Sequence, residues 1–209
     1  MKAYLACEFA LLFVAIPAAM AVRIVPRAPI PVLVVAAAIT STALLRDPTF
    51  DRRRLWNVAG ALAHARGVVL LFVALAVAVT LLVAWLTPEA LFDLVRKRPG
   101  LWLLVMVFYP LVSVYPQEII YRAFLFQRYA PLFPTPLAIV AASSAAFAFG
   151  HVFFPRPWVA VGMTFVGGLL FGYHYAVSGS LLLASVEHAL LGQLMFTVGL
   201  GRFFYHRGA

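Results

Sequence analysis

The sequence predicts an all-α integral membrane protein, a polytopic transmembrane helical bundle of about seven spans. Three features lead to this class: 65% of the 209 residues are hydrophobic, only 11% are charged, and the mean hydropathy is +0.99. A soluble domain of this size does not bury so much apolar surface. The apolar runs are continuous rather than alternating, which argues against a transmembrane β-barrel.

Three apolar runs fill the first half of the chain and predict spans at about residues 4–22, 30–45 and 67–86. Pro26, Pro29 and Pro31 break the helix between the first two runs. The polar segment from Arg46 to Arg66 precedes the third run, and its apolar residues have a loosely helical spacing. This segment is therefore expected to form an amphipathic helix lying on the membrane surface.

Four more spans are predicted in the second half, at about residues 101–130, 136–154, 157–176 and 179–199. A short amphipathic helix should precede them, because Thr87-Pro88-Glu89 has the composition of a helix start. Pro110 and Pro116 interrupt the fourth span and predict a kinked helix there. No linker divides the chain, so residues 1–209 are expected to form a single integral membrane domain.

The net charge of +9 does not indicate a nucleic-acid partner. The arginines lie between apolar runs, where they anchor loops to anionic membrane lipids. Cys7 is the only cysteine, which excludes an intrachain disulfide and a thiolate metal site. The expected partners therefore include membrane lipids, while the oligomeric state stays open.

A few ionisable side chains fall inside predicted spans, where charge is costly and is by default functional. Glu118 and Arg122 are four residues apart, so on a helix they share one face and form a pair. His151 and His188 lie in later spans and could converge with them. Such a group suits acid–base chemistry on water, or a metal ion. The simpler interpretations are an ion pair that pins the bundle and histidines that only pack.

The residues required for three kinds of intramembrane hydrolase chemistry are missing from this sequence or fall in predicted loops. There is no His-Glu-x-x-His zinc motif. The aspartates Asp47, Asp51 and Asp93 all fall in predicted loops, which argues against an aspartyl dyad. No serine nucleophile with a paired base is evident.

The chain resembles the CAAX protease and bacteriocin-processing family, which are glutamic-type intramembrane endopeptidases. The resemblance rests on Gln117-Glu118-x-x-x-Arg122, on Phe147-x-x-x-His151 and on His188, and it covers about residues 101–200. The family patterns are Glu-Glu-x-x-x-Arg, Phe-x-x-x-His and His-x-x-x-Asn. The resemblance implies that a glutamate and His151 activate water, and that His188 steadies the oxyanion.

Two residues depart from the family patterns. Gln117 stands at the first glutamate and cannot act as a base, and Gly192 stands at the asparagine and has no side-chain donor. The hypothesis is therefore that Glu118 is the general base, with His151 and His188 as its catalytic partners. Gln117, Arg122 and Phe147 are expected to support them, with no cofactor.

Three alternatives remain at this point. One is a catalytically inactive relative that binds a membrane partner, because both departures fall at chemically central positions. Another is a metal-dependent membrane protease in which Glu118, His151 and His188 hold an ion such as zinc. The third is a proton or ion path through the same groups. In each case the expected location is the bacterial inner membrane, and a peptidase would take a membrane-associated or lipidated substrate.

Overall fold

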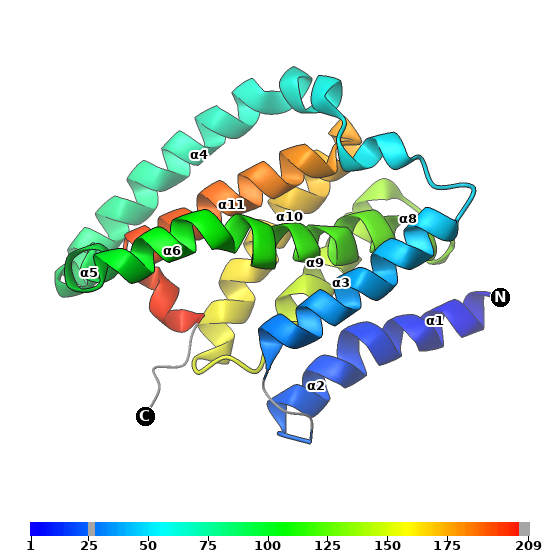
Figure 1. Ribbon diagram of the computed structural model, residues 1–209, viewed down its shortest axis with the longest axis horizontal. Coiled ribbons are helices and arrows are strands. Elements are labelled where there is room, and N and C mark those ends of the chain that lie inside the picture. Colours follow the sequence, from blue (N-terminus) through cyan, green and yellow to red (C-terminus); the bar gives the residue numbers. More distant parts are fainter. Residues whose placement is uncertain (25–27, 205–209) are drawn as a thin grey trace.

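The computed structural model describes residues 1–24 and 28–204, and across these residues the chain is a bundle of helices without a β-strand (Figure 1). The predicted all-α class is confirmed. Pro26 and Arg27, between the first two spans, lie outside the described residues.

The first half of the chain contains three long helical stretches at the predicted positions. α1 (Lys2–Ala10) and α2 (Ile16–Ala21) are joined by a π-helical turn into one continuous helix. α3 (Pro29–Arg46) has its two prolines at its start, where the fixed proline φ suits the first turn of a helix. α4 (Val58–Leu86) is the longest helix of the described chain.

α4 begins before the predicted span at residue 67, and this corrects the prediction of a surface helix. The segment from Arg46 to Arg66 forms a 3-10 helix (Arg52–Leu55) followed by the first turns of α4. The start of α4 is set by Asn57, whose side-chain oxygen accepts a hydrogen bond from the Gly60 amide at 3.0 Å. The cap satisfies an amide at the helix start that would otherwise lack a partner.

The second half of the chain contains α5 (Asp93–Lys97), α6 (Pro99–Tyr109), α7 (Tyr115–Glu118), α8 (Leu125–Tyr129), α9 (Pro136–Phe149), α10 (Pro157–Ser178) and α11 (Leu181–Thr197). The path from α6 to α8 is one helical stretch that is interrupted twice. The first interruption is a π-helical segment that begins at the predicted Pro110, and the second, Ile119–Phe124, begins three residues after Pro116, which lies in α7. Such segments concentrate at functional sites.

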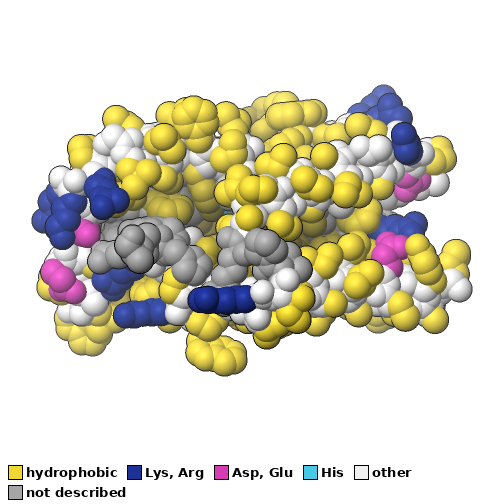
Figure 2. Space-filling model, turned by 60° about the horizontal axis from the view of Figure 1, so that its bottom comes forward, with side chains coloured by type: hydrophobic (Ala, Val, Ile, Leu, Met, Phe, Trp, Pro, Cys, Tyr) yellow, Lys and Arg dark blue, Asp and Glu magenta, His cyan; other side chains and the backbone are white. Residues whose placement is uncertain are grey.

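Five helical stretches are long and apolar enough to cross a membrane: Lys2–Ala21, Pro29–Arg46, Arg52–Leu86, Pro99–Leu132 and Pro157–Ser178. α9 and α11 are shorter apolar helices of 14 and 17 residues. Each predicted span therefore coincides with an apolar helix. Figure 2 shows hydrophobic side chains over most of one face, with most charged side chains toward the two ends. The chain is an integral membrane protein.

Hydrogen bonds between helix ends tie one end of the bundle together. They join Asn57 to the Ser178 carbonyl, Gln127 to Asp47, and Arg128 to Glu8, at 3.2, 2.9 and 2.9 Å. The end of α3, the start of α4, the end of α8 and the turn between α10 and α11 therefore share one end of the bundle. This arrangement agrees with successive apolar helices crossing in alternate directions.

α9 and α10 pack closely because α10 presents glycines to α9. A Cβ atom at Gly168 would lie 3.0 Å from the Cα of Ser144, and one at Gly172 would lie 3.4 Å from Val140. Two glycines four residues apart share one helix face and allow this close contact. The packing brings the Gly168 carbonyl within reach of the helix that carries Glu118 and Arg122.

Candidate active site

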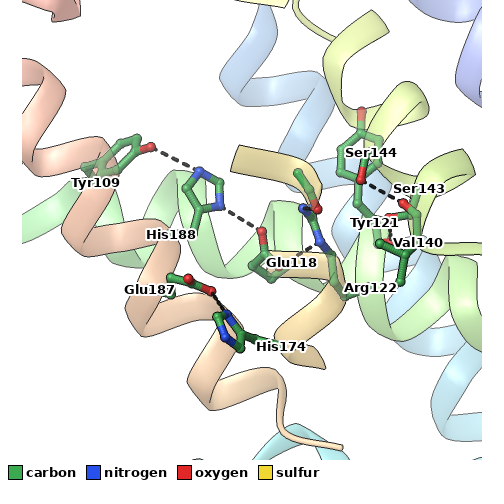
Figure 3. Close-up of polar contacts among 11 residues, drawn as sticks. Tyr109, Glu118, Tyr121, Arg122, Val140, Ser143, Ser144, His174, Glu187 and His188 are labelled. Carbon is green, nitrogen blue, oxygen red and sulfur yellow. Dashed lines mark hydrogen bonds and ion pairs between the residues drawn. The ribbon is translucent and has the colours of Figure 1, made fainter. Parts of the chain in front are cut away.

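Glu118 and Arg122 form a buried ion pair at the junction of α7 and the π-helical segment that follows it. Both side chains are fully buried, and Arg122 Nε lies 3.2 Å from Glu118 Oε2 without the angle of a hydrogen bond. Arg122 Nη2 also donates to the Gly168 carbonyl at 3.2 Å (Figure 3). The guanidinium carbon lies 4.7 Å from the Phe147 ring centroid and 5.5 Å from that of Phe171, which places the charge over aromatic faces. The i,i+4 pair predicted from the sequence is confirmed.

His188 of α11 connects this pair to a tyrosine. Its Nδ1 lies 2.8 Å from Glu118 Oε1, and its Nε2 lies 3.2 Å from the Tyr109 hydroxyl (Figure 3). The imidazole stacks on Phe171 with a centroid distance of 4.6 Å and an interplanar angle of 13°. Glu118, His188 and Tyr109 therefore form a hydrogen-bonded chain that crosses from α7 through α11 to α6.

His151 lies in the turn that follows α9, and its orientation is fixed. Its Nδ1 lies 2.8 Å from the Phe147 carbonyl, which accepts a hydrogen bond and cannot donate one. Nδ1 therefore carries the proton in the neutral ring, and Nε2 keeps its lone pair. The turn needs glycine before the histidine, because a Cβ atom at Gly150 would lie 2.5 Å from the Tyr121 hydroxyl.

Both histidines line one large cavity of about 1360 Å³. The ring of Phe147 contacts both imidazoles, with centroid distances of 4.9 Å to His151 and 5.4 Å to His188. The remaining walls are mainly apolar residues of α2, α3, α6, α10 and α11. Glu118 and Arg122 do not line the cavity, although the sequence predicted one pocket for all four ionisable residues.

The two residues that depart from the family patterns both line this cavity. Gln117 donates from Nε2 to the Ser113 hydroxyl at 2.7 Å, and its Oε1 is buried with no hydrogen-bond partner among the described residues. Gly192 faces Tyr109, whose ring fills the space beside it. An unpartnered buried oxygen is an available acceptor for a water molecule or a substrate.

The described residues contain no group of three or more His, Cys, Asp or Glu side chains that could hold a metal ion. In the set proposed from the sequence, Glu118 and His188 bond to each other, and His151 Nδ1 bonds to a backbone carbonyl. The residues as arranged do not fit a three-ligand metal site.

Sequence reasoning missed two contacts near this site. Tyr109 is the last residue of α6 and has no spacing relation to His188, from which it is 79 residues away. The second contact joins His174 of α10 to Glu187 of α11, with Nδ1 lying 2.8 Å from Oε2 (Figure 3). Glu187 is buried at 2% exposure, so it gains a partner across the turn between α10 and α11.

The fold and the site define a class: a helical membrane protein with histidines on an intramembrane cavity and a buried Glu–Arg pair behind them. A scan against family models gives a match to the type II CAAX prenyl endopeptidase Rce1-like family over residues 99–192. This segment contains the three motifs quoted above. The match covers 94 of the 209 residues and supports the resemblance to the CAAX protease family seen in the motifs. Searches of curated proteins and of solved structures found no match.

Proposed function

We propose that this protein is an intramembrane endopeptidase that hydrolyses a peptide bond of a lipidated or otherwise membrane-associated substrate. The observation that carries the proposal is that His151 and His188 face one cavity and each has its Nδ1 occupied by a fixed acceptor. Fixed ring orientation is what acid–base catalysis on a bound water requires. The family match supports the reaction class, and the likeness to bacteriocin-processing enzymes supports the bacterial inner membrane as the location.

In this proposal His151 is the general base. Its Nε2 holds a lone pair, because Nδ1–H is given to the Phe147 carbonyl. Gln117 cannot take a proton, but its unpartnered Oε1 is suited to accept a hydrogen bond and so to orient the water. The water oxygen would bond to the carbonyl carbon of the substrate while its proton passes to His151 Nε2.

Glu118 acts indirectly in this proposal, although the sequence suggested it as the base itself. One of its oxygens bonds to His188 and the other faces Arg122, and the carboxylate does not line the cavity. A buried carboxylate at Nδ1 orients the imidazole and stabilises positive charge on it. Nδ1 of His188 is then held by Glu118 and Nε2 by the Tyr109 hydroxyl, so the ring acts on the substrate only through its place on the cavity wall.

The apolar cavity favours a substrate that carries a long apolar group. Its wall is apolar over most of its surface, and helices from both halves of the chain contribute to it. Apolar surface favours an isoprenyl or acyl chain, because burial of each methylene contributes about 0.8 kcal/mol. The polar groups at Gln117, His151 and His188 would then face the peptide beside that chain.

The test uses the purified full-length protein in liposomes with two peptides of one sequence, one farnesylated near its C-terminus and one unmodified. We expect cleavage of the farnesylated peptide only, with the cut bond identified by mass spectrometry. Cleavage should persist after treatment with a strong chelator. Loss of cleavage on chelation, with recovery on zinc addition, would favour the metal-dependent alternative.

A second candidate function is favoured by one specific observation, the glutamine at the position of the family's first glutamate. A protein without activity that still binds the farnesylated peptide would be a membrane partner-binding relative. Binding without product, in wild type and in Gln117→Glu alike, would establish that function and contradict the peptidase.

A further inference from the structure

We infer that Tyr109 supplies the hydrogen-bond donor that Gly192 lacks, and that its hydroxyl stabilises the oxyanion of the proposed reaction. The inference rests on the proposed function and adds a catalytic residue to it. Tyr109 belongs to no motif that the sequence revealed. It is assigned by three observations that do not depend on one another: the space that its ring occupies, its hydrogen bond and its place on the cavity wall.

The first observation is that the ring of Tyr109 occupies the space of a side chain at position 192. A Cβ atom there would lie 2.5 Å from Tyr109 Cε1 and 2.7 Å from Cζ, and it would be closer still to the hydroxyl oxygen. Real Cβ atoms essentially never come this close to other heavy atoms. The ring is held in place by Phe196, which packs edge-on at a centroid distance of 5.4 Å. The Tyr109 ring can therefore take this position only because residue 192 has no side chain.

The second observation is the hydrogen bond between Tyr109 and His188. The hydroxyl lies 3.2 Å from Nε2, while Nδ1 is 2.8 Å from the buried carboxylate of Glu118. In the neutral ring Nδ1–H donates to Glu118, and the tyrosine donates its proton to Nε2. In the protonated ring, Nε2–H donates to the tyrosine oxygen. The hydroxyl proton of Tyr109 is then free to point to a third group.

The third observation is that Tyr109, His188, Gln117 and His151 all line the same cavity. His188 bonds to Tyr109, and the Phe147 ring contacts both His188 and His151, so the proposal places the substrate carbonyl between His151 and Tyr109. When the water oxygen bonds to the carbonyl carbon, the carbonyl π pair moves to the oxygen, and Tyr109 donates its hydrogen bond there. His151 receives the water proton, so charge and protons balance in this step.

Activity is tested with Tyr109→Phe, which keeps the ring and removes only the hydroxyl. Loss of one oxyanion donor lowers kcat by about 10²–10³-fold, and we expect this fall with KM unchanged. Tyr115→Phe is the matched control, because Tyr115 stacks on Trp56 and does not line the cavity.

A rescue experiment uses the double variant Tyr109→Ala/Gly192→Asn. Its kcat should be at least tenfold higher than that of Tyr109→Ala alone, because the asparagine side chain then has space and supplies a hydrogen-bond donor. Tyr109→Phe that is folded and as active as wild type would overturn the catalytic assignment.

The second measurement is independent of activity and compares thermal unfolding. Gly192→Asn should lower the Tm of the wild type strongly, and it should lower the Tm of Tyr109→Ala much less. Equal effects in the two backgrounds would overturn the claim that the ring occupies this space. A wild type that cleaves no peptide would overturn the proposed function and with it the catalytic role. The Tm comparison would still decide whether Tyr109 replaces a side chain at 192.

Discussion

At the scale of single residues, Arg122 illustrates how a buried charge is held in this bundle. It is paired with Glu118, bonded to a carbonyl of α10 and covered by two aromatic rings. Arg122→Ala would leave the Glu118 carboxylate buried without its partner. Removing one member of such a pair costs about 3–5 kcal/mol, so we expect a marked loss of folded protein and of Tm.

The double variant Glu118→Gln/Arg122→Leu distinguishes this account from a simple loss of packing. It removes both charges and should be more stable than Arg122→Ala alone. The comparison requires only unfolding curves in detergent. If the double variant is the less stable of the two, the stranded charge is not the cause.

Gln117 stands where the family pattern has a glutamate, and its amide cannot take the proton of the attacking water. Its buried Oε1 has no partner in the described part of the chain, and Ser113 is a ready hydrogen-bond donor beside it. Gln117→Glu should therefore fold and raise kcat by about tenfold, because a second group could then take the water proton. A folded Gln117→Glu protein that cleaves more slowly than wild type would contradict the role given to this position.

At the scale of helices, the contact between α9 and α10 places the site. A Cβ atom added at Gly168 would lie 3.0 Å from the Cα of Ser144. The Gly168 carbonyl also accepts a hydrogen bond from Arg122. Gly168→Val should force the two helices apart and cost about 1–3 kcal/mol, measured as a lower Tm. Gly162→Ala on the same helix is the control, because nothing lies within 4 Å of its Cβ position. Equal Tm values for the two variants would show that this contact does not limit stability.

The sequence predicted the helices better than their ends. Hydropathy alone locates each apolar helix, since the membrane requires a continuous apolar run. It places the start of α4 too late, because the Asn57 cap extends the helix into a polar segment. It also extends the fifth predicted span to residue 154, whereas α9 ends at Phe149 and a turn carries His151. Capping and turns depend on contacts that periodicity does not contain.

The site was predictable where its residues share a helix face or a motif spacing. The Glu118–Arg122 pair follows from the i,i+4 rule, and His188 joins it as expected from the scarcity of intramembrane charge. Tyr109 could not be predicted, because its link to His188 joins distant parts of the chain. Glu118 is buried behind the cavity wall, and this placement also depends on packing that residue spacing does not predict.

At the scale of the whole molecule, the bundle places a polar site on a large apolar cavity. Residues from α2 and α3 at one end of the chain and α11 near the other complete its wall. The outer face is apolar as well, so the lipidated substrate proposed for this protein would lie in the same bilayer as the bundle (Figure 2). In the proposed reaction, His151 activates water in this cavity.

That claim is tested most directly by the kcat of His151→Ala in liposomes with the farnesylated peptide. General-base catalysis contributes about 10²–10⁴-fold, so we predict a fall of that size with the Tm unchanged. His64→Ala is the control, since His64 lies on α4, bonds to the Gly60 carbonyl and does not line the cavity. A folded His151→Ala protein that cleaves as fast as His64→Ala and wild type would contradict the account.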